Sequence, residues 1–407
     1  MYVHRTIESY LKKGTGNFPV LLVTGARQVG KTTLLKHLAK ANRRYVTLDD
    51  PLTRSLAKED PSLFLQRFPP PVLIDEIQYA PEIFPLIKIA VDRDRKPGLF
   101  WLTGSQKFHM MKHVSESLAG RVAIIDLPGF SRRERSGVKA CHEPFIPGGK
   151  SLDQRIATSP PLSLKALYRL IWRGGFPEMA LREEMDANLF FSSYVQTYLQ
   201  RDVRDLANVG DEMTFFRFLR AVASRTGQIL NYEHLSRDAN VSQPTAKRWL
   251  SILRASGCVY LLEPWHSNVM KRMIKSPKLY FTDTGLCSWL LEWTSPETLE
   301  AGSMSGAMLE TWVINEIIKS YQNAGIRPPL YFYRDKDKRE IDLLIIRDGE
   351  IHPVEIKKTA SPSRRDIKHF SLLDKSPLEF GTGALICLIE NPLPLTESSM
   401  AIPAGML

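Results

Sequence analysis

The spacing of hydrophobic and polar residues changes along the chain and separates three regions. From about residue 17 to 127, short apolar runs without polar alternation are separated by stretches with helical spacing. This pattern predicts a parallel sheet whose strands are buried on both faces and covered by helices. The predicted strands are PVLLVTG from Pro19, RYVTLDD from Arg44, PVLIDE from Pro71, LFWLTGS from Leu99 and VAIIDLP from Val122.

The remaining regions predict a helical middle and a mixed end. Residues 128–161 are rich in Pro, Gly, Ser and charge, which is typical of a linker or an exposed loop. Helical spacing then continues to about residue 291, and strand patterns return from about residue 310. A length of 407 residues fits about two or three domains. We therefore predict domains at 1–160, 161–295 (with a winged helix at about 226–266) and 296–407.

Composition excludes several classes of protein. With 43% hydrophobic and 24% charged residues, the chain is not a disordered one. It has no apolar run of 18 residues, and its start, MYVHRTIESYLKK, lacks an apolar signal core. We therefore expect neither a membrane span nor secretion. The four cysteines are far apart and form no C-x-x-C pair, which fits a reducing, cytoplasmic setting.

The balance of charge favours a polyanionic partner. The chain has 55 Lys and Arg against 44 Asp and Glu, a net charge of +11. Such an excess is typical of proteins that bind nucleic acid, although a basic soluble enzyme would also carry it.

A phosphate-binding motif follows the first predicted strand. The string GARQVGKT matches G-x-x-x-x-G-K-[ST], with an apolar strand before it and the helical TLLKHLAK after it. In such a loop, backbone N–H groups and a helix N-terminus surround the phosphates. Lys31 would reach the β- and γ-phosphates, and the Thr32 hydroxyl would bind Mg²⁺. The predicted ATP-binding residues are Gly25, Ala26, Arg27, Gln28, Val29, Gly30, Lys31, Thr32, Thr33 and, from a later strand, Asp75.

Two adjacent acids end the apolar run VLIDE. The carboxyl ends of parallel strands form the ligand-binding edge of an open α/β sheet. Asp75 is predicted to hold Mg²⁺, and Glu76 to orient and activate the attacking water. One acid would suffice for nucleotide binding alone, so the second favours ATP hydrolysis. In LTGSQ, Ser105 or Gln106 could contact the γ-phosphate or the water, but both could equally be an ordinary polar strand end.

Phosphoryl transfer also calls for a cation close to the transferred phosphate. Arg121, in SLAGRVAI, is the preferred arginine finger, with Arg132 and Arg133 as alternatives. Each of these could instead be a solvated surface arginine. A neighbouring subunit of a homo-oligomer could also supply the finger.

The helical middle contains a pattern typical of a winged helix-turn-helix. Ser242 is a predicted N-cap, and Ala246, Leu250 and Leu253 recur at the spacing of a buried helix face. CVYLLEPW then predicts a wing strand. A helix of this kind would contact DNA through residues that face outward. These are Gln243, Thr245, Lys247 and Arg248, with Lys271, Arg272 and Lys275 as phosphate contacts. The alternative is a module that only packs beside the ATPase core.

The end of the chain predicts a β-hairpin that brings acids together. Asp348-Gly349 is a strong two-residue turn between apolar runs. Pairing around it places Asp342 opposite Glu355, and Lys357 opposite Glu340. Two opposed carboxylates repel each other unless a partner lies between them. Oxygen ligands favour Mg²⁺ or Mn²⁺ as that partner.

A further acid lies on a predicted helix, where Glu310 shares an apolar stripe with Val313, Ile314 and Ile317. The order helix acid, strand Asp, Glu-x-Lys resembles the PD-(D/E)-x-K nucleases of the restriction-endonuclease-like fold. In that scheme Glu310, Asp342 and Glu355 hold the metal ion and Lys357 positions the nucleophile. The alternatives are a surface hairpin with solvated charges, or a related fold that is an inactive binding module.

Taken together, these blocks resemble a widespread prokaryotic family of AAA-type ATPases with a C-terminal region of unknown function. The resemblance is carried by LLVTGARQVGKTTLL, VLIDEIQ, LTGSQKF with SESLAGR, RGGFPEM, SYVQTYLQRDVRDL, KLYFTDTGL, YFYRDKDKREIDLLI and VEIK. It implies an α/β P-loop NTPase core of the AAA type, then a winged-helix region and an α/β restriction-endonuclease-like domain. It also implies nucleotide binding at Gly25–Thr32, Asp75 and Glu76, and a nuclease-like site at Glu310, Asp342, Glu355 and Lys357.

Two hypotheses about function follow. The first is a DNA-directed ATPase that couples ATP to a metal-dependent nuclease domain. The second is an ATP-dependent switch or assembly protein whose nuclease-like domain is an inactive scaffold.

Overall fold

Two units make up the chain, which a computed structural model describes at residues 2–39, 41, 43–105, 107–138, 143–199, 212–266, 276–374 and 376–407. The first unit is Met1–Phe130 with Ala255–Gly257 and Gln322–Gly325. The second is Ser131–Arg254, Cys258–Tyr321 and Ile326–Leu407. Among the described residues, no helix has the length and apolarity needed to cross a bilayer.

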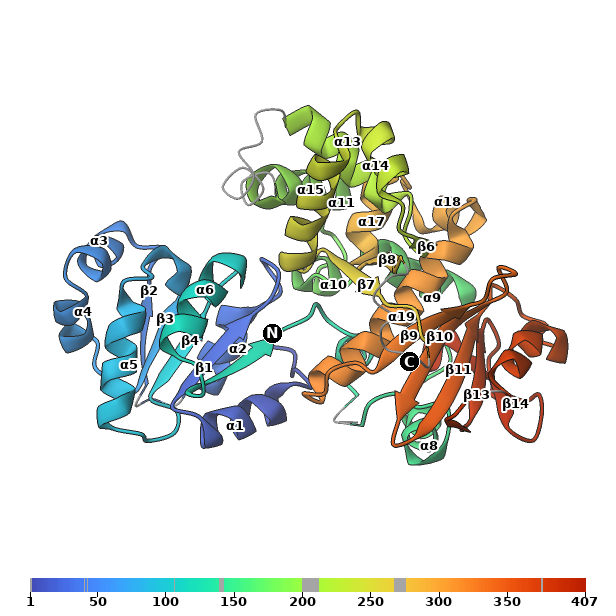
Figure 1. Cartoon of the computed structure of the whole chain (residues 1–407), viewed down its shortest axis with the longest axis horizontal. Coiled ribbons are helices and arrows are strands. Elements are labelled where there is room, and N and C mark those ends of the chain that lie inside the picture. Colours follow the sequence, from blue (N-terminus) through green and yellow to red (C-terminus); the bar gives the residue numbers. More distant parts are fainter. Residues whose placement is uncertain are drawn as a thin grey trace. The chain divides into compact units, whose positions relative to one another are not determined.

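A parallel sheet forms the centre of the first unit (Figure 1, blue to cyan). Its strands pair in the order β2-β3-β4-β1-β5, and every pair is parallel. Strand β4 lies between β1, which leads into the phosphate-binding motif, and β3, which ends in the acids. The strands are β1 (Val20–Thr24), β2 (Arg44–Thr47), β3 (Val72–Asp75), β4 (Phe100–Thr103) and β5 (Val122–Asp126), so all five predicted strands are confirmed.

Helices cover both faces of this sheet because successive side chains of a strand point to opposite sides. Val20 and Leu22 of β1 belong to a buried cluster with residues of α4, α5 and α6. Leu21 lies on the other face, near Gly14 of α1. The helices are α1 (Glu8–Asn17), α2 (Lys31–Leu38), α3 (Pro51–Glu59), α4 (Pro61–Arg67), the 3-10 helix η1 (Ile77–Tyr79), α5 (Ile83–Arg93) and α6 (Lys107–Ser117).

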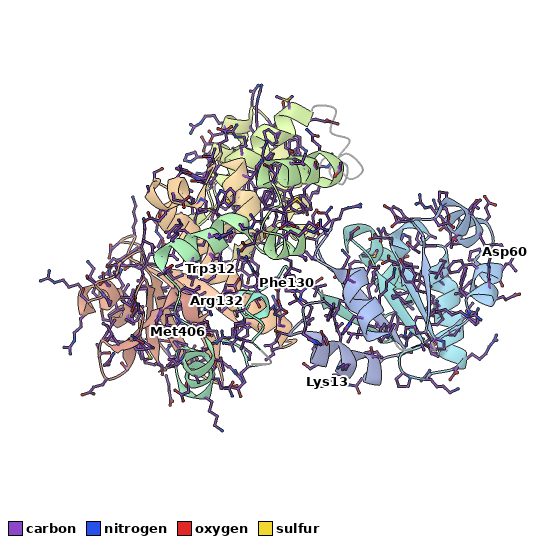
Figure 2. The ribbon with its side chains drawn as sticks, turned by 180° about the vertical axis from the view of Figure 1, so that it is seen from behind. Lys13, Asp60, Phe130, Arg132, Trp312 and Met406 are labelled. Carbon is purple, nitrogen blue, oxygen red and sulfur yellow. The ribbon has the colours of Figure 1, made fainter. Side chains whose placement is uncertain are left out.

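The predicted linker is an ordered part of the second unit wherever the structure describes it. A capping box between Ser131 and Glu134 begins α7 (Arg132–Arg135), and α8 (Gly149–Thr158) follows. The prediction of an exposed loop is therefore wrong for these residues. The first unit ends at Phe130, whereas the sequence placed the first domain boundary at residue 160. Figure 2 shows the buried Arg132, Trp312 and Met406 inside the second unit.

More helices of the second unit surround these segments. They are α9 (Leu164–Arg173), α10 (Pro177–Leu181), α11 (Ala187–Tyr194), the π-helix η2 (Val195–Leu199), α17 (Thr284–Leu290), α18 (Pro296–Ala301) and α19 (Ser305–Asn323).

A helix-strand module lies where the winged helix was predicted. Its elements are α13 (Glu212–Ala223), β6 (Gln228–Ile229), α14 (Tyr232–Ala239), α15 (Gln243–Ala255), β7 (Val259–Leu262) and β8 (Lys278–Phe281). The strands form an antiparallel sheet in the order β6-β8-β7. Trp249 of α15 contacts Phe215 and Phe218 of α13 edge to face, which fixes α15 against the module core.

A mixed sheet ends the chain (Figure 1, orange and red). Its order is β14-β15-β13-β11-β10-β9, with β12 beside β11. The predicted hairpin register is confirmed, because Leu343 pairs with Val354 and Arg347 with Glu350. The elements are β9 (Leu330–Arg334), β10 (Glu340–Arg347), β11 (Glu350–Ile356), η3 (Arg364–Leu373), β12 (Glu379–Phe380), β13 (Gly383–Cys387), β14 (Leu393–Pro394), β15 (Ser399–Pro403) and η4 (Ala404–Met406).

Candidate functional site

The predicted phosphate-binding loop joins β1 to α2. Gly25 has a φ of +139°, and a Cβ atom there would lie 2.4 Å from the Leu127 carbonyl oxygen, so only glycine fits. The Lys31 ammonium, at the first residue of α2, donates to the carbonyl oxygens of Gly25 (3.1 Å) and Ala26 (2.9 Å). Among the other loop residues, Val29 is buried, Gln28 and Thr33 are exposed, and Arg27, Gly30 and Thr32 are half-buried.

Asp75 lies beside this loop and accepts hydrogen bonds from three hydroxyl groups. Thr32 Oγ1 donates to Asp75 Oδ1 at 2.7 Å, and Tyr45 Oη donates to Oδ2 at 3.0 Å. Thr103, at the end of β4, also donates to Oδ1. The structure thus brings together Thr32 and Asp75, the two residues predicted to hold Mg²⁺. Tyr45 and Thr103 were missed, although both lie on predicted strands.

Glu76 follows β3 in a left-handed backbone conformation, with a φ of 57°. Such strain in a non-glycine residue clusters at functional sites. The Glu76 N–H donates to Thr103 Oγ1 at 3.0 Å. Its carboxylate accepts hydrogen bonds from Gln78 and, at 3.1 Å, from Ser105. Ser105 therefore lies beside Glu76, whereas its alternative Gln106 is outside the described residues. Gln78 was not predicted to have a role.

Two further groups near the loop were not predicted. Asp49 follows β2, and burial together with the negative charges of Glu76 and Asp75 raises its pKa. Arg5 is buried, and its guanidinium donates to the carbonyl oxygens of Val29 (3.1 Å) and Pro128 (2.6 Å). The sequence could have indicated Asp49, because it lies near the end of the predicted strand RYVTLDD and the carboxyl ends of parallel strands converge. No sequence pattern distinguishes Arg5.

The predicted arginine finger does not reach the loop within its own chain. Arg121 precedes β5, and its carbonyl accepts from the N–H of Val20, the first residue of β1. It therefore lies at the amino-terminal edge of the sheet, a whole strand of roughly 17 Å from the phosphate-binding loop. Its guanidinium also binds both carboxylate oxygens of Asp92, at 2.7 and 3.1 Å.

The alternative fingers, Arg132 and Arg133, are buried within the second unit. Arg132 donates to the Pro160 carbonyl at 2.8 Å, and Arg133 donates to Thr158 Oγ1 at 3.0 Å. These contacts connect α7 to the end of α8 and the residues after it. Neither arginine is the solvated surface residue that the sequence allowed.

The residues predicted to contact DNA lie mostly on the outer face of α15. Gln243, Lys247 and Arg248 are exposed, and Thr245 is half-buried. Ser242 caps the helix as predicted, since its Oγ accepts from the Thr245 N–H at 3.3 Å. The predicted phosphate contacts Lys271, Arg272 and Lys275 lie outside the described residues.

The acids predicted for the nuclease-like site do converge, but around a lysine. We call Glu310, Glu340, Asp342 and Glu355 the carboxylate centre. Lys278 of β8 places its ammonium 2.6 Å from Glu340, 3.1 Å from Glu310 and 3.6 Å from Asp342.

Burial and charge set the protonation of this centre. Burial disfavours the charged form of Lys278, but the neighbouring acidic groups outweigh it and raise the pKa of the ammonium above its usual value. Burial and the negative charge of Asp342 raise the pKa of both Glu310 and Glu355. Hydrogen bonding to Asp342 raises the pKa of Glu355 further, which favours its neutral form. The positive charge beside these carboxylates thus comes from the protein itself.

The predicted metal ligands do not fit a metal ion in this arrangement. In the described part of the chain, no three His, Cys, Asp or Glu side chains are placed to hold one. The Lys357 ammonium lies 3.4 Å from Asp366 on η3, an acid outside the predicted set. The predicted pair of Lys357 with Glu340 is not among the pairs of the hairpin of β10 and β11, because Lys357 follows the last residue of β11. On its other side, Glu340 pairs with Arg334 of β9. The cation that the structure places beside Glu310 and Asp342 is the Lys278 ammonium, whereas Glu355 interacts with Asp342.

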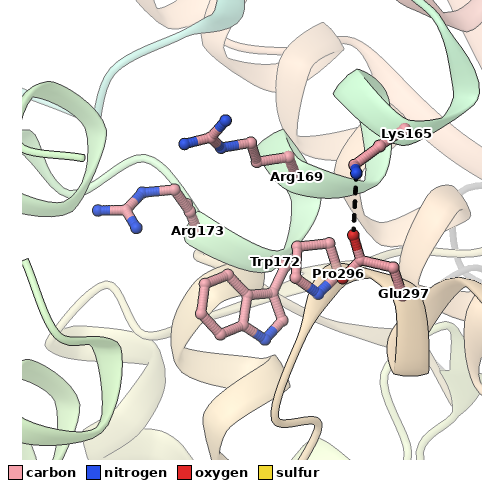
Figure 3. A pocket seen from close by; sticks show the side chains of 6 residues that line it. All are labelled: Lys165, Arg169, Trp172, Arg173, Pro296 and Glu297. Carbon is pink, nitrogen blue, oxygen red and sulfur yellow. Dashed lines mark ion pairs between the residues drawn. The ribbon is translucent and has the colours of Figure 1, made fainter. Parts of the chain in front are cut away.

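A pocket of about 250 Å³ lies elsewhere in the second unit (Figure 3). Its cations already have partners: Lys165 lies 3.6 Å from Glu297, and Arg169 lies 3.1 Å from Glu183. Arg173 donates to two backbone carbonyls. The pocket is lined by Lys165, Arg169, Trp172, Arg173, Pro296 and Glu297. Because its cations are engaged by the protein itself, we assign it no ligand.

Comparison with family models assigns the first unit to a known class. An AAA domain matches residues 17–136. Two domains of unknown function follow, DUF8612 at residues 164–297 and DUF4143 at residues 305–407. With the parallel sheet and the loop between β1 and α2, the AAA match defines a P-loop ATPase of the AAA type.

The chain belongs to a prokaryotic family of such ATPases with a C-terminal domain of unknown function. Its relatives include the uncharacterized proteins Rv2008c of Mycobacterium tuberculosis and Mb2031c of Mycobacterium bovis. Each is 30% identical over 405 residues, which cover 99% of this chain and 84% of the relative.

Similar solved structures include a Walker-type ATPase and a branch migration motor. The Walker-type ATPase PABY2304 of Pyrococcus abyssi is 14% identical with a TM-score of 0.44, over 70% of this chain and 94% of that one. The RuvB Holliday junction branch migration motor of Thermotoga maritima is 15% identical with a TM-score of 0.31, over 62% and 88%. Scores of this size carry no argument, so the fold assignment rests on the sheet and the family model.

Proposed function

We propose that the chain is a DNA-directed ATPase, in which ATP turnover in the first unit is coupled to DNA contact by the module of α13 to β8. The observation that carries the proposal is the outer face of α15. A buried aromatic cluster fixes this helix, and its exposed side presents Gln243, Lys247 and Arg248. The order helix, strand, helix, helix, strand, strand supports a winged helix, whose last helix would enter the major groove.

We assign ATP binding and hydrolysis to the backbone N–H groups of the loop, the Lys31 ammonium, the Glu76 carboxylate and the two side chains that hold this carboxylate. Backbone N–H groups from Gly25 to Gly30 surround the phosphates, and the Lys31 ammonium exchanges its carbonyl partners for phosphate oxygens. Glu76 accepts a proton from the attacking water. Gln78 and Ser105 hold its carboxylate in place, because both donate hydrogen bonds to it. Lys31 and Glu76 are thus the groups that act on the reacting atoms.

The magnesium ion that accompanies ATP fits the hydroxyl and carboxylate oxygens of Thr32 and Asp75, which lie 2.7 Å apart. Bound there, it would neutralise charge on the β- and γ-phosphates. A second copy of the chain is the proposed source of the finger arginine, because Arg121 does not reach the phosphates in its own chain. Specific ATPase activity should then rise with protein concentration.

Cleavage of DNA is not part of this proposal. Two of the acids predicted to bind metal, Glu310 and Asp342, lie within 3.6 Å of the Lys278 ammonium, and Lys357 lies 3.4 Å from Asp366. We propose that ATP turnover is coupled to DNA binding and not to DNA cleavage. The proposal thus keeps the DNA-directed ATPase of the first hypothesis and the inactive nuclease-like domain of the second.

The test is ATP turnover with and without duplex DNA at several salt concentrations. We expect DNA to stimulate turnover and its affinity to fall steeply with salt, since each phosphate contact contributes about 0.9 to the logarithmic slope. Lys247→Ala with Arg248→Ala should weaken DNA binding and reduce this slope by about 2. Basal turnover should not change.

The matched control is Lys12→Ala with Lys13→Ala, an adjacent pair of exposed lysines on α1. This pair removes the same charge from another surface, so DNA stimulation should stay at the level of the parent protein. Turnover that DNA leaves unchanged would contradict the proposal and favour a nucleotide switch without DNA. An equal loss in both double variants would mean that net charge, rather than α15, attracts the DNA.

A further inference from the structure

Lys278 occupies a fixed position at the carboxylate centre. It begins β8, the central strand of its sheet, and its backbone pairs with Ile229 of β6 and Leu262 of β7. Its side chain is only 3% exposed. Tyr280 lies two residues further, on the same face of the strand, and donates to Glu310 Oε1 at 2.6 Å. One strand face therefore brings an ammonium and a hydroxyl to the same carboxylate.

The positive charge of Lys278 matches its surroundings, which are acidic. An ammonium has three N–H donors and no acceptor. Three carboxylates lie within 3.6 Å of Lys278 Nζ, one from helix α19 and two from strand β10. A helix acid and a strand acid are also what the predicted nuclease-like arrangement would offer a metal ion. The ammonium thus occupies the space and supplies the charge that a divalent ion would need.

A divalent ion would have to displace this ammonium. Oxygen ligands bind Mg²⁺ at about 2.1 Å and Ca²⁺ at about 2.3–2.6 Å. An ion at such distances from Glu310 and Asp342 would lie against Lys278 Nζ and be repelled by it. Moving the side chain away would leave a buried charge without its partners, which is strongly unfavourable.

We propose that the Lys278 ammonium is the resident cation of the carboxylate centre, and that the centre binds no divalent metal ion while Lys278 is in place. The carboxylate centre is then an internal cluster of ion pairs in place of a metal site. This proposal goes beyond the proposed function and does not depend on DNA binding.

The test counts Mn²⁺ ions bound per chain without nucleotide, from the electron paramagnetic resonance signal of free Mn²⁺. Lys278→Met should bind one more ion than the parent protein, because it exposes the carboxylates to the metal. That ion should also raise the unfolding temperature of the variant and should be lost in Lys278→Met with Asp342→Asn. ATP hydrolysis by the first unit should persist, and a far-UV circular dichroism spectrum like that of the parent protein should show that the second unit of the variant is folded.

The matched control is Lys319→Met, which removes another buried ammonium of the second unit, 2.8 Å from Glu316. It should gain no ion. A folded Lys278→Met protein without an additional ion overturns the proposal.

A second measurement decides the matter if Lys278→Met does not fold. The parent protein and Glu310→Gln should bind the same number of Mn²⁺ ions, because Glu310 already has an internal partner. Fewer ions on Glu310→Gln would mean that the parent centre holds a metal, which overturns the proposal. The DNA-stimulated ATPase assay has no part in this count, so failure of either proposal is recognised separately.

Discussion

Two lysines of this chain are almost equally buried and have different surroundings. Lys31, in the phosphate-binding loop, is 5% exposed and donates to backbone carbonyl oxygens. Lys278, at the carboxylate centre, is 3% exposed and lies among three carboxylates. A carboxylate carries the opposite charge and therefore attracts an ammonium more strongly than a neutral carbonyl oxygen does. Lys31 can therefore exchange its partners for phosphate, whereas Lys278 is held by its own protein.

The acids of the two sites differ in the same way. Asp75 accepts from the hydroxyls of Thr32, Thr103 and Tyr45, which carry no charge. Glu310 accepts from the Tyr280 hydroxyl but also from the Lys278 ammonium. A cluster of acids therefore indicates a metal site only when no cationic side chain of the protein already balances its negative charge. Four predictions test the two sites and the difference between them.

Glu76→Gln should have the largest effect, on turnover. Loss of the proposed proton acceptor should lower kcat by about 10²- to 10⁴-fold. ATP affinity should be retained, because the amide keeps the size of the side chain and can still bond to Ser105 and Gln78. The measurements are steady-state phosphate release and equilibrium binding of a fluorescent ATP analogue. Turnover at the parent rate would assign the proton acceptor to another residue.

The two lysines should respond oppositely to the same change. Lys278→Met should lower the free energy of unfolding of the second unit by about 3 kcal/mol, since it leaves three half-buried acids close together without their cation. Lys31→Met should cost about 1 kcal/mol of stability but weaken ATP binding by about 2–5 kcal/mol.

Urea unfolding and nucleotide titration of both variants give the comparison. If Lys31→Met destabilised the protein as much as Lys278→Met, the two lysines would not differ in the way that we describe.

Features encoded in short stretches of sequence could be predicted. The loop GARQVGKT needs glycine where φ is positive, and the Asp348-Gly349 turn sets the hairpin register because both residues adopt positive φ. Lys278 could not be predicted in the same way, because its partners lie on a helix and a strand far along the chain. A lysine that opens the apolar run KLYF was still a usable signal, since a buried charge needs partners.

Arg121 and the arginines near residue 130 show a different limit. Strand direction could have excluded Arg121, because a residue before a parallel strand lies at the edge opposite the ligand-binding one. For Arg132 and Arg133, a charged, Pro-rich stretch indicated solvent exposure, but both guanidinium groups are buried against backbone and hydroxyl oxygens. Local composition does not record such tertiary hydrogen bonds.

Arg5→Ala should destabilise the phosphate-binding loop without removing a group that takes part in ATP hydrolysis. The guanidinium donates to the Val29 carbonyl of the phosphate-binding loop and to Pro128, and lies over the Phe130 ring. The charge-assisted hydrogen bonds to these carbonyls and a longer one to Gly129 are lost, so we expect a cost of about 3 kcal/mol in unfolding free energy. KM for ATP should rise more than kcat falls. Arg5→Lys should restore only part of the stability, because an ammonium lacks the forked geometry of the guanidinium.

The smallest effects should come from removing one hydroxyl at each site. Tyr280 is fully buried and donates to Glu310 at 2.6 Å, whereas Tyr45 is 39% exposed and donates to Asp75 at 3.0 Å. Tyr280→Phe should cost about 2 kcal/mol in unfolding free energy, because the Glu310 carboxylate loses a donor at a fully buried position that water does not readily reach. Tyr45→Phe should cost less than about 1 kcal/mol, since water reaches that position. Denaturant unfolding of the two single variants measures the difference, and equal costs would mean that burial does not set the strength of these contacts.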